Sequence, residues 1–527
     1  MLCIGPAPGA VSFAYAGPAT SAGSRAVSRN PCGSHTAFGF FASQEERNMS
    51  ELSSSSSPVS QASAATRAKA KPARLALRAA AAVVVAALAF SAYAVAFPAD
   101  VPEPVGAIVE NLTGANPHPV VLQRPPVAPL SAMAQLGKQL FFDPALSASG
   151  KQSCASCHSP EHAYGPPNGL DVQQGGLAMT QQGYRPPPSL MYLYRQPNFS
   201  IGPDAGENDD APTVAQQATA AAGVVKSQKT AGGPSTSVEM VPQGGLFWDG
   251  RADTLQQQAY GPLLNPVEMA NTSVDQVAGK LEHASYAKRF TELFGSRIFG
   301  DRKLLVSEAM FAISRYQVED PSFHPYNSKY DRWLEGHARL TRAELRGLRL
   351  FNDANKANCA GCHLSKPGKD GLPPMFTDYQ YEALGVPRNG KLAQNKDPRF
   401  FDLGVCGPFR ADMKDQTQYC GMFLTPTLRN SATRTVFFHN GLYHDLDHVM
   451  AFYNERNTDP GKFYPRDAHG KIEKYDDIPP QYQKNVDVTD APFDRQFGDK
   501  PAMTDGEIRD IIAFLKTLND DPPSSSH

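Results

Sequence analysis

Two short stretches of the 527-residue sequence each place two cysteines and a histidine within five residues. They are Cys154, Cys157 and His158 in the first half of the chain, and Cys359, Cys362 and His363 in the second half. Cys-x-x-Cys-His is the attachment pattern of c-type haem. Its two thiols can form thioethers with the haem vinyl groups, and its histidine can bind the iron. We therefore expect two covalently bound haem c groups, with His158 and His363 as iron ligands.

Other uses of these cysteines fit the sequence less well. A structural zinc site needs a further ligand pair at short spacing, and neither stretch supplies a clean one. A disulfide oxidoreductase uses Cys-x-x-Cys but does not need the histidine that follows both copies here. Cys406 and Cys420 lie outside the motifs, and in an oxidising compartment they either form a disulfide or stay as two buried thiols.

Similar segments surround the two motifs. Each motif follows a Gly-x-x-Leu-Phe-x-Asp run, GKQLFFD from Gly137 and GLRLFND from Gly347. This repetition predicts two cytochrome-type units in tandem. We expect each unit to close with a helix. One covers Leu304–Gln317, and the other is TDGEIRDIIAFLKTL, where Thr504 and Glu507 form a capping box before a helical apolar stripe. The expected fold is mostly α, with many turns at its 45 prolines and 42 glycines.

Composition and the N-terminal residues indicate the compartment. With 50 Lys and Arg against 52 Asp and Glu, the net charge is -2, which gives no reason to expect nucleic-acid binding. Residues 1–98 are typical of a leader, because basic residues precede the apolar run Ala79–Phe97. That run is either a cleaved export signal or an N-terminal membrane anchor, and residues 99–128 form a linker. Both cases predict a periplasmic protein, released or tethered to the inner membrane.

Four stretches resemble the bacterial dihaem cytochrome c peroxidase and MauG family. They are LFFDPALSASGKQSCASCH, FWDGRADTLQQQAYGPLLNPVEM, FTDYQYEALGVPRN and TPTLRNSATRTVFFHNGLYHDLDHVMAFYN. The resemblance implies two tandem cytochrome c-type domains with the haems near the domain interface. The first, residues 129–325, would carry the peroxidatic haem and an insertion at 198–243. The second, residues 326–527, would carry the electron-transfer haem. The implied reaction is reduction of hydrogen peroxide.

The resemblance also implies roles at the first haem. In the better-known peroxidases of the family, a histidine after the first motif caps the iron. Here residues 163–247 contain no histidine, and His162 is too close in sequence to His158. We expect an open iron, as in MauG, unless another domain or chain supplies a cap. Glu268 is expected to move the peroxide proton, Gln258 to order peroxide or water, and Trp248 to relay holes between the haems.

The second haem's far ligand lies, in the family, fourteen residues after the histidine of a His-x-Gly element. Counting from His439 reaches Tyr453, which makes the chain closer to the MauG-like, Tyr-ligated type. Met450 is a competitor, because it lies one helical step away. The family's calcium site uses an asparagine where this chain has Pro186, and Arg434 lies near the expected carbonyl ligands, so calcium is doubtful.

Three functions follow from these expectations. The first is a peroxidase that takes electrons from a small periplasmic donor, a cytochrome c or a cupredoxin, and whose second haem shares the oxidising equivalents. The second is a MauG-like enzyme that oxidises residues of a partner protein. The third is a dihaem electron-transfer protein without enzymatic activity.

Overall fold

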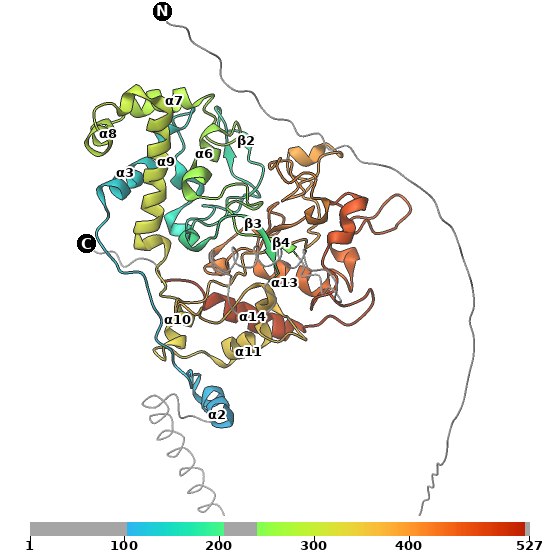
Figure 1. The fold of residues 1–527 in the computed structure, drawn as a ribbon. Helices are drawn as coiled ribbons and strands as arrows, with labels where there is room; N and C mark the ends of the chain where they lie inside the picture. Colours follow the sequence, from blue (N-terminus) through green and yellow to red (C-terminus); the bar gives the residue numbers. More distant parts are fainter. Residues whose placement is uncertain (1–102, 205–239, 522–527) are drawn as a thin grey trace, which may run out of the picture. The chain divides into compact units, whose positions relative to one another are not determined.

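Helices are the main regular elements of the residues that the structure, a computed structural model, describes: 103–204 and 240–521 (Figure 1). These residues belong to one unit, Arg74–His527. The predicted leader and the middle of the predicted insertion lie outside the described residues. Within the described ranges, no helix combines the length and apolar character that a membrane crossing requires.

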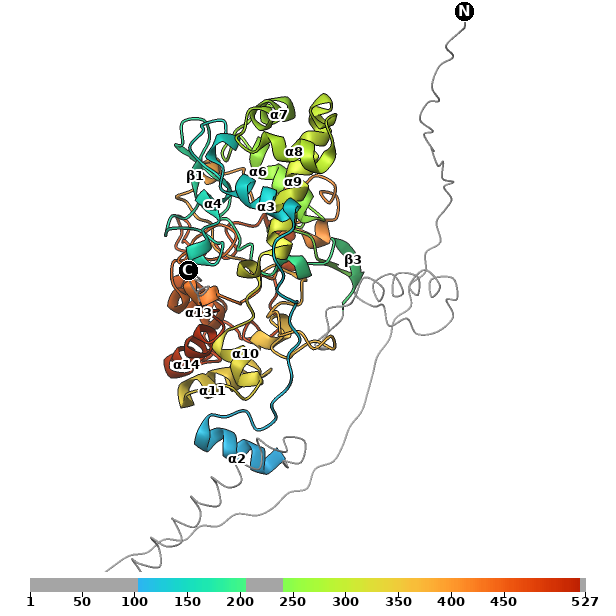
Figure 2. The ribbon, with the colours of Figure 1, turned by 90° about the vertical axis from the view of Figure 1, so that its left-hand side faces the viewer.

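The first half is built around the long helix α9, Arg302–Glu319, which covers the helix expected at 304–317. Packed against α9 are α3 (Ala132–Phe141), α6 (Leu255–Leu264) and α7 (Val274–Glu282), and α8 (Ala287–Phe294) follows α7 (Figure 2). Their apolar faces form one core, which includes Leu140, Phe141 and Ile313.

The second half has its own core, between α11 (Arg342–Phe351) and α14 (Asp505–Lys516). The capping box predicted at Thr504 and Glu507 is present at the start of α14. The other α-helices of the described residues are α2 (Glu103–Thr113), α4 (Cys154–Cys157), α10 (Lys329–Leu334), α12 (Cys359–Cys362) and α13 (Leu446–Glu455). The helix α2 lies inside the segment expected to be a linker.

The glycines of the repeated run lie where helices cross. A Cβ atom on Gly137 of α3 would lie 1.8 Å from the Ala312 carbonyl oxygen of α9. A Cβ atom on Gly347 of α11 would lie 2.0 Å from the Asp510 carbonyl oxygen of α14. Both distances are far inside van der Waals contact, so only glycine lets these backbones approach so closely, which explains the glycine of the repeated run.

Three short antiparallel ladders complete the described structure. They pair β1 (Gln174–Gly175) with β2 (Gln181–Gln182), β3 (Ser200–Pro203) with β4 (Met240–Gln243), and β5 (Tyr381–Glu382) with β6 (Phe423–Leu424). In the second ladder Ser200 lies opposite Gln243, so the ends of the predicted insertion are paired with each other.

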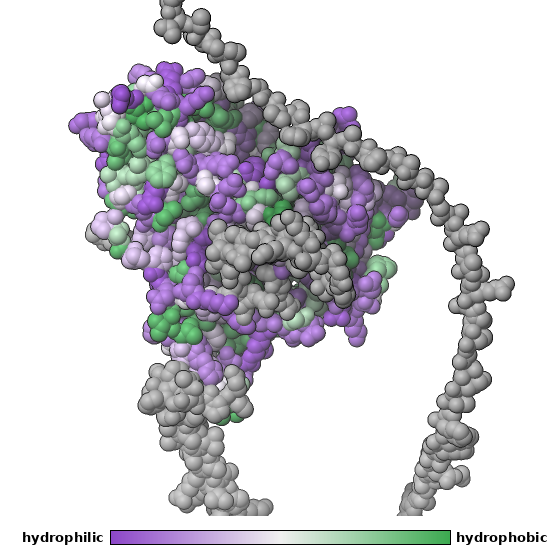
Figure 3. Space-filling view, viewed as in Figure 1, coloured by the Kyte–Doolittle hydropathy of each residue, from purple (hydrophilic) through white to green (hydrophobic). Residues whose placement is uncertain are grey.

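Ion pairs hold distant segments together, and a disulfide closes a local loop. The Arg185 guanidinium bonds Asp249 at 2.9 Å and Asp402 at 2.7 Å. Cys406 and Cys420 form the disulfide, which confirms the first of the two alternatives. On the face shown in Figure 3, hydrophilic and hydrophobic residues are interspersed.

Candidate active site and haem sites

The first Cys-x-x-Cys-His motif forms the short helix α4 and its C-terminal cap. His158 is the cap, and its backbone N–H donates to the Cys154 carbonyl at 2.9 Å. Its ring Nδ1 lies 3.1 Å from the Tyr164 carbonyl oxygen. Because a carbonyl only accepts, Nδ1 carries the proton and Nε2 keeps its lone pair. Burial lowers the pKa of His158 to about 4, so the imidazole is neutral, as a metal ligand must be.

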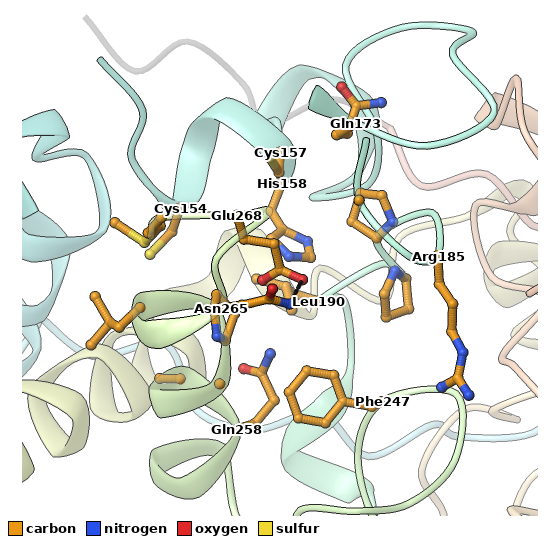
Figure 4. A pocket seen from close by; sticks show the side chains of 18 of the residues that line it. Cys154, Cys157, His158, Gln173, Arg185, Leu190, Phe247, Gln258, Asn265 and Glu268 are labelled. Atoms are coloured by element: carbon orange, nitrogen blue, oxygen red, sulfur yellow. Dashed lines mark hydrogen bonds between the residues drawn. The ribbon is translucent and has the colours of Figure 1, made fainter. Parts of the chain in front are cut away.

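This motif opens onto a cavity of about 320 Å³, called cavity 1 (Figure 4). The thiols of Cys154 and Cys157 are free, and burial raises the pKa of both to about 12. The lining also contains the three residues predicted to act at this site, Trp248, Gln258 and Glu268. The structure therefore brings together in one space residues that lie more than ninety positions apart in the sequence.

Glu268 is held within cavity 1 by a neighbour on the same loop. The Asn265 side-chain amide donates to its carboxylate at 2.8 Å (Figure 4). Burial raises the pKa of Glu268, and Arg251 and Asn265 act against that rise. Gln258 comes from α6, which begins at the Thr254 cap. The Glu268 carboxyl group, with its raised pKa and its bond to the Asn265 amide, is suited to proton transfer.

The second motif repeats the geometry of the first. It forms α12 and its cap His363, whose Nδ1 lies 2.8 Å from the Phe376 carbonyl oxygen. Burial lowers the pKa of His363 to about 4. Cys359, Cys362 and His363 line a cavity of about 210 Å³, called cavity 2. The same local sequence thus produces the same neutral histidine beside a cavity twice.

Both candidates for the far ligand come from α13 and line cavity 2. Met450 is buried among apolar residues of the second core. Tyr453 stacks on Phe493, with ring centres 5.4 Å apart, and burial raises the pKa of its hydroxyl. The thiols of Cys362 and Cys359 contribute to that rise, so the hydroxyl lies near the second haem motif.

Trp248 lines cavity 1, cavity 2 and a third cavity of about 140 Å³, called cavity 3. Its indole N–H donates to the Pro186 carbonyl at 2.9 Å. His162 lines cavity 3 rather than cavity 1, and its Nδ1 lies 3.1 Å from the Ser159 hydroxyl. His158 is therefore the only histidine among the described residues that line cavity 1.

Both cavities fit a haem group by the chemistry of their walls. Each has a pair of free thiols and a neutral histidine at the spacing that covalent attachment requires. Among the described residues, the buried His439 Nε2 at cavity 2 has no hydrogen-bond partner, and neither do the side-chain oxygens of Gln152 and Gln317 at cavity 1. Buried polar atoms without partners are uncommon and indicate a missing bound group or water.

Comparisons with known proteins decide the family. The family model for di-haem cytochrome c peroxidase matches residues 131–339. The methylamine utilization protein MauG of Paracoccus denitrificans is 32% identical over 399 residues, which are 74% of this chain and 89% of that protein. The chain belongs to the di-haem cytochrome c peroxidase and MauG family. The resemblance inferred from the four stretches is confirmed.

Further relatives agree with this membership of the di-haem cytochrome c peroxidase and MauG family. Cytochrome c551 peroxidase of Nitrosomonas europaea is 28% identical over 414 residues, covering 77% of this chain and 87% of that protein. The crystal structure of the diheme peroxidase BthA from Burkholderia thailandensis aligns with a TM-score of 0.63 and 35% identity, covering 76% and 89% of the two chains. As a member of this family the chain is a haem-dependent oxidoreductase with a mostly α, cytochrome c-type fold.

Sequence reasoning missed some site residues of this family member. Asn265 lies three residues before Glu268, within the NPVEM run, but only the structure shows that the two side chains are bonded. The positive charge of Arg251 lowers the pKa of Glu268 against the effect of burial. The guanidinium carbon of Arg251 lies 3.7 Å from the centre of the Phe247 ring. Nothing in their spacing distinguishes Asn265 and Arg251 from ordinary loop residues.

Proposed function

We propose that this protein is a dihaem c-type peroxidase that reduces hydrogen peroxide at the first haem site. The observation that carries the proposal is cavity 1, which places His158 and the two thiols in one space with Glu268 and Gln258. When bound, the two haems would supply the iron that reduces peroxide and a second iron that shares the oxidising equivalents. The remaining roles belong to side chains of this chain.

Glu268 is the proposed proton carrier. Heterolysis of the peroxide O–O bond needs a proton to leave one oxygen and reach the other, and a carboxylate within hydrogen-bond reach can do both. Asn265 fixes one carboxylate oxygen at 2.8 Å, which leaves the other for the substrate. Gln258, on the same cavity wall, can order peroxide or water. Since His158 is the only histidine in the described lining, peroxide has access without displacing a histidine.

At the second site, His363 and Tyr453 are the proposed iron ligands. The position of the Tyr453 hydroxyl near the thiols of Cys359 and Cys362 favours it over Met450, whose surroundings are apolar. A phenolate ligand stabilises oxidised iron more than a thioether does. Trp248 is the proposed relay, because its side chain borders both haem cavities.

The proposed partners follow from the chemistry and the leader. Reduction of peroxide to water consumes two electrons, which a small cytochrome c or cupredoxin would deliver in the periplasm. The alternative is oxidation of residues in a partner protein, which the similarity to a protein named MauG favours. Adding a candidate donor or a candidate protein substrate and following peroxide consumption would distinguish the two.

Electron paramagnetic resonance of the as-isolated ferric protein tests the proposal. We expect one high-spin haem, open to peroxide, and one low-spin haem with two protein ligands. Addition of peroxide should change the high-spin signal. Two low-spin haems that do not respond to peroxide would contradict the proposal and indicate an electron-transfer protein.

A further inference from the structure

Arg434 lines cavity 3, which shares Trp248 with both haem cavities, and among the described residues no carboxylate pairs with its positive charge. Its Nε donates to the Val436 carbonyl at 3.3 Å, and its Nη2 donates to the Pro187 carbonyl at 3.4 Å. Burial lowers its pKa to about 10, so the group stays charged at neutral pH. Arg185 and Arg429, which are also buried, differ because each is paired with aspartate.

The carbonyls near this guanidinium belong to a run of three prolines. The Pro186 carbonyl accepts from the Trp248 indole at 2.9 Å. The Pro187 carbonyl accepts from the guanidinium. The Pro188 carbonyl lies close enough to His158 to favour its protonated form. Proline has no N–H and a fixed φ, so the run is stiff and presents only acceptors. Two consecutive carbonyls thus hold the relay candidate and a cation, and the third lies near the first haem's histidine.

A calcium ion, which the family resemblance implies at this place, does not fit these residues. Calcium takes six to eight oxygen ligands. Pro186 has no side-chain oxygen where an asparagine is expected, and the Pro187 and Val436 carbonyls already accept from Arg434. Among the described residues, no cluster of three or more acidic, histidine or cysteine side chains is arranged to hold a metal ion.

We propose that Arg434 is a built-in cation that replaces a divalent metal ion at this junction. It joins the proline run to residues 434–436 and so positions Trp248 and His158. Gly165 leaves room for the guanidinium, since a Cβ atom there would lie 3.3 Å from Nη1. Arg434 lines cavity 3 and is not among the residues that line cavity 1, where peroxide is proposed to react, so it is a positioning residue, and its charge also acts on His158.

The haem-loaded wild-type protein provides the first test. Metal analysis of the purified protein should find no stoichiometric calcium. Treatment with the chelator EGTA should leave the reduction potentials and the electron paramagnetic resonance spectra of both haems unchanged. Stoichiometric calcium, or a shift on chelation, would overturn the proposal. No peroxide is used, so the result is independent of the proposed peroxidase activity.

Two variants provide the second test. Arg434→Gln removes the charge but keeps a donor of similar reach, whereas Arg434→Lys keeps the charge. Loss of a nearby positive charge stabilises the ferric state, so the first haem's potential should fall in Arg434→Gln and stay near that of the wild type in Arg434→Lys. Equal potentials in all three proteins would overturn the proposal. If Arg434→Gln does not fold, the metal and chelator measurements decide.

Discussion

Glu268 is the single residue on which the proposed chemistry depends most. We expect Glu268→Gln to lower peroxide turnover by about 10²–10⁴-fold, the usual contribution of general acid–base catalysis. Because burial raises the pKa of Glu268 despite Arg251 and Asn265, the wild-type rate should fall on acidification at a higher pH than an exposed glutamate would give. Steady-state assays across pH would check both effects.

A matched variant separates this role from a general effect of charge. Glu292 is exposed on α8 and is paired only with Lys288 on the surface. Glu292→Gln should keep the wild-type rate and pH profile. A Glu268→Gln enzyme with full activity, or an unchanged acid limb of the pH profile, would remove Glu268 from the mechanism.

Single substitutions can also show whether Tyr453 or Met450 is the second iron ligand at cavity 2. Tyr453→Phe removes one oxygen atom, and Met450→Leu removes the thioether with little change in volume. If Tyr453 is the ligand, Tyr453→Phe should convert the low-spin haem to another spin state and Met450→Leu should not. Optical and electron paramagnetic resonance spectra of the two ferric variants would show this. The reverse pattern would assign Met450 as the ligand.

At the scale of elements, each haem motif follows a helix that crosses another helix at a glycine. Gly137 and Gly347 let α3 and α11 touch the backbones of α9 and α14. We expect Gly137→Ala and Gly347→Ala each to lower the free energy of unfolding by about 3 kcal/mol or more, the upper part of the usual range for overpacking. Chemical denaturation followed by circular dichroism would measure the loss.

Gly279 is the matched control for these two variants. It also lies in a helix, α7, but a Cβ atom there would meet nothing within 4 Å. Gly279→Ala should therefore gain about 0.5–1 kcal/mol through lower conformational entropy of the unfolded chain. If Gly137→Ala were equally stabilising, the close approach would not constrain the fold.

These elements also show what sequence can and cannot predict. The haem motifs and the Thr504 capping box were predictable because their residues are neighbours and their chemistry is local. The repeated Gly-x-x-Leu-Phe-x-Asp run was visible, but its cause was not, since each glycine touches a helix more than 160 positions away. The helix α2 was missed because its contacts are equally distant: the Gly114 carbonyl just beyond it accepts from the Trp333 indole.

At the scale of the whole molecule, buried charge connects the two halves. Arg185 comes from the first half and bonds Asp402 of the second through two nitrogens, each at 2.7 Å. Burial would raise the pKa of Asp402, but Arg185 outweighs burial and holds the pKa below its usual value. The pairing of Arg185 with Asp402 could not be predicted from the sequence, because 217 positions separate the two residues.

Removing Arg185 should therefore be costly, and the cost should depend on pH. Arg185→Gln leaves Asp402 buried without its cation, and we expect a loss of about 3–5 kcal/mol at neutral pH. The folded-state pKa of Asp402 would then lie above its unfolded value, near 3.9. Stability would be lost as pH rises through the new pKa, whereas the wild type loses this contribution only as pH falls through its depressed pKa. The gap between the two proteins should shrink on acidification.

Denaturation midpoints at pH 7 and pH 4 would measure that gap. Arg399→Gln is the control, because Arg399 is 88% exposed and pairs with Asp397 on the surface, where an ion pair contributes less than about 1 kcal/mol. The double variant Arg185→Gln with Asp402→Asn should recover part of the loss, since neither charge is then buried alone. If the single variant showed the same gap at both pH values and the double variant recovered nothing, packing of Arg185 against Phe409 and Phe423, rather than its charge, would hold the two halves together.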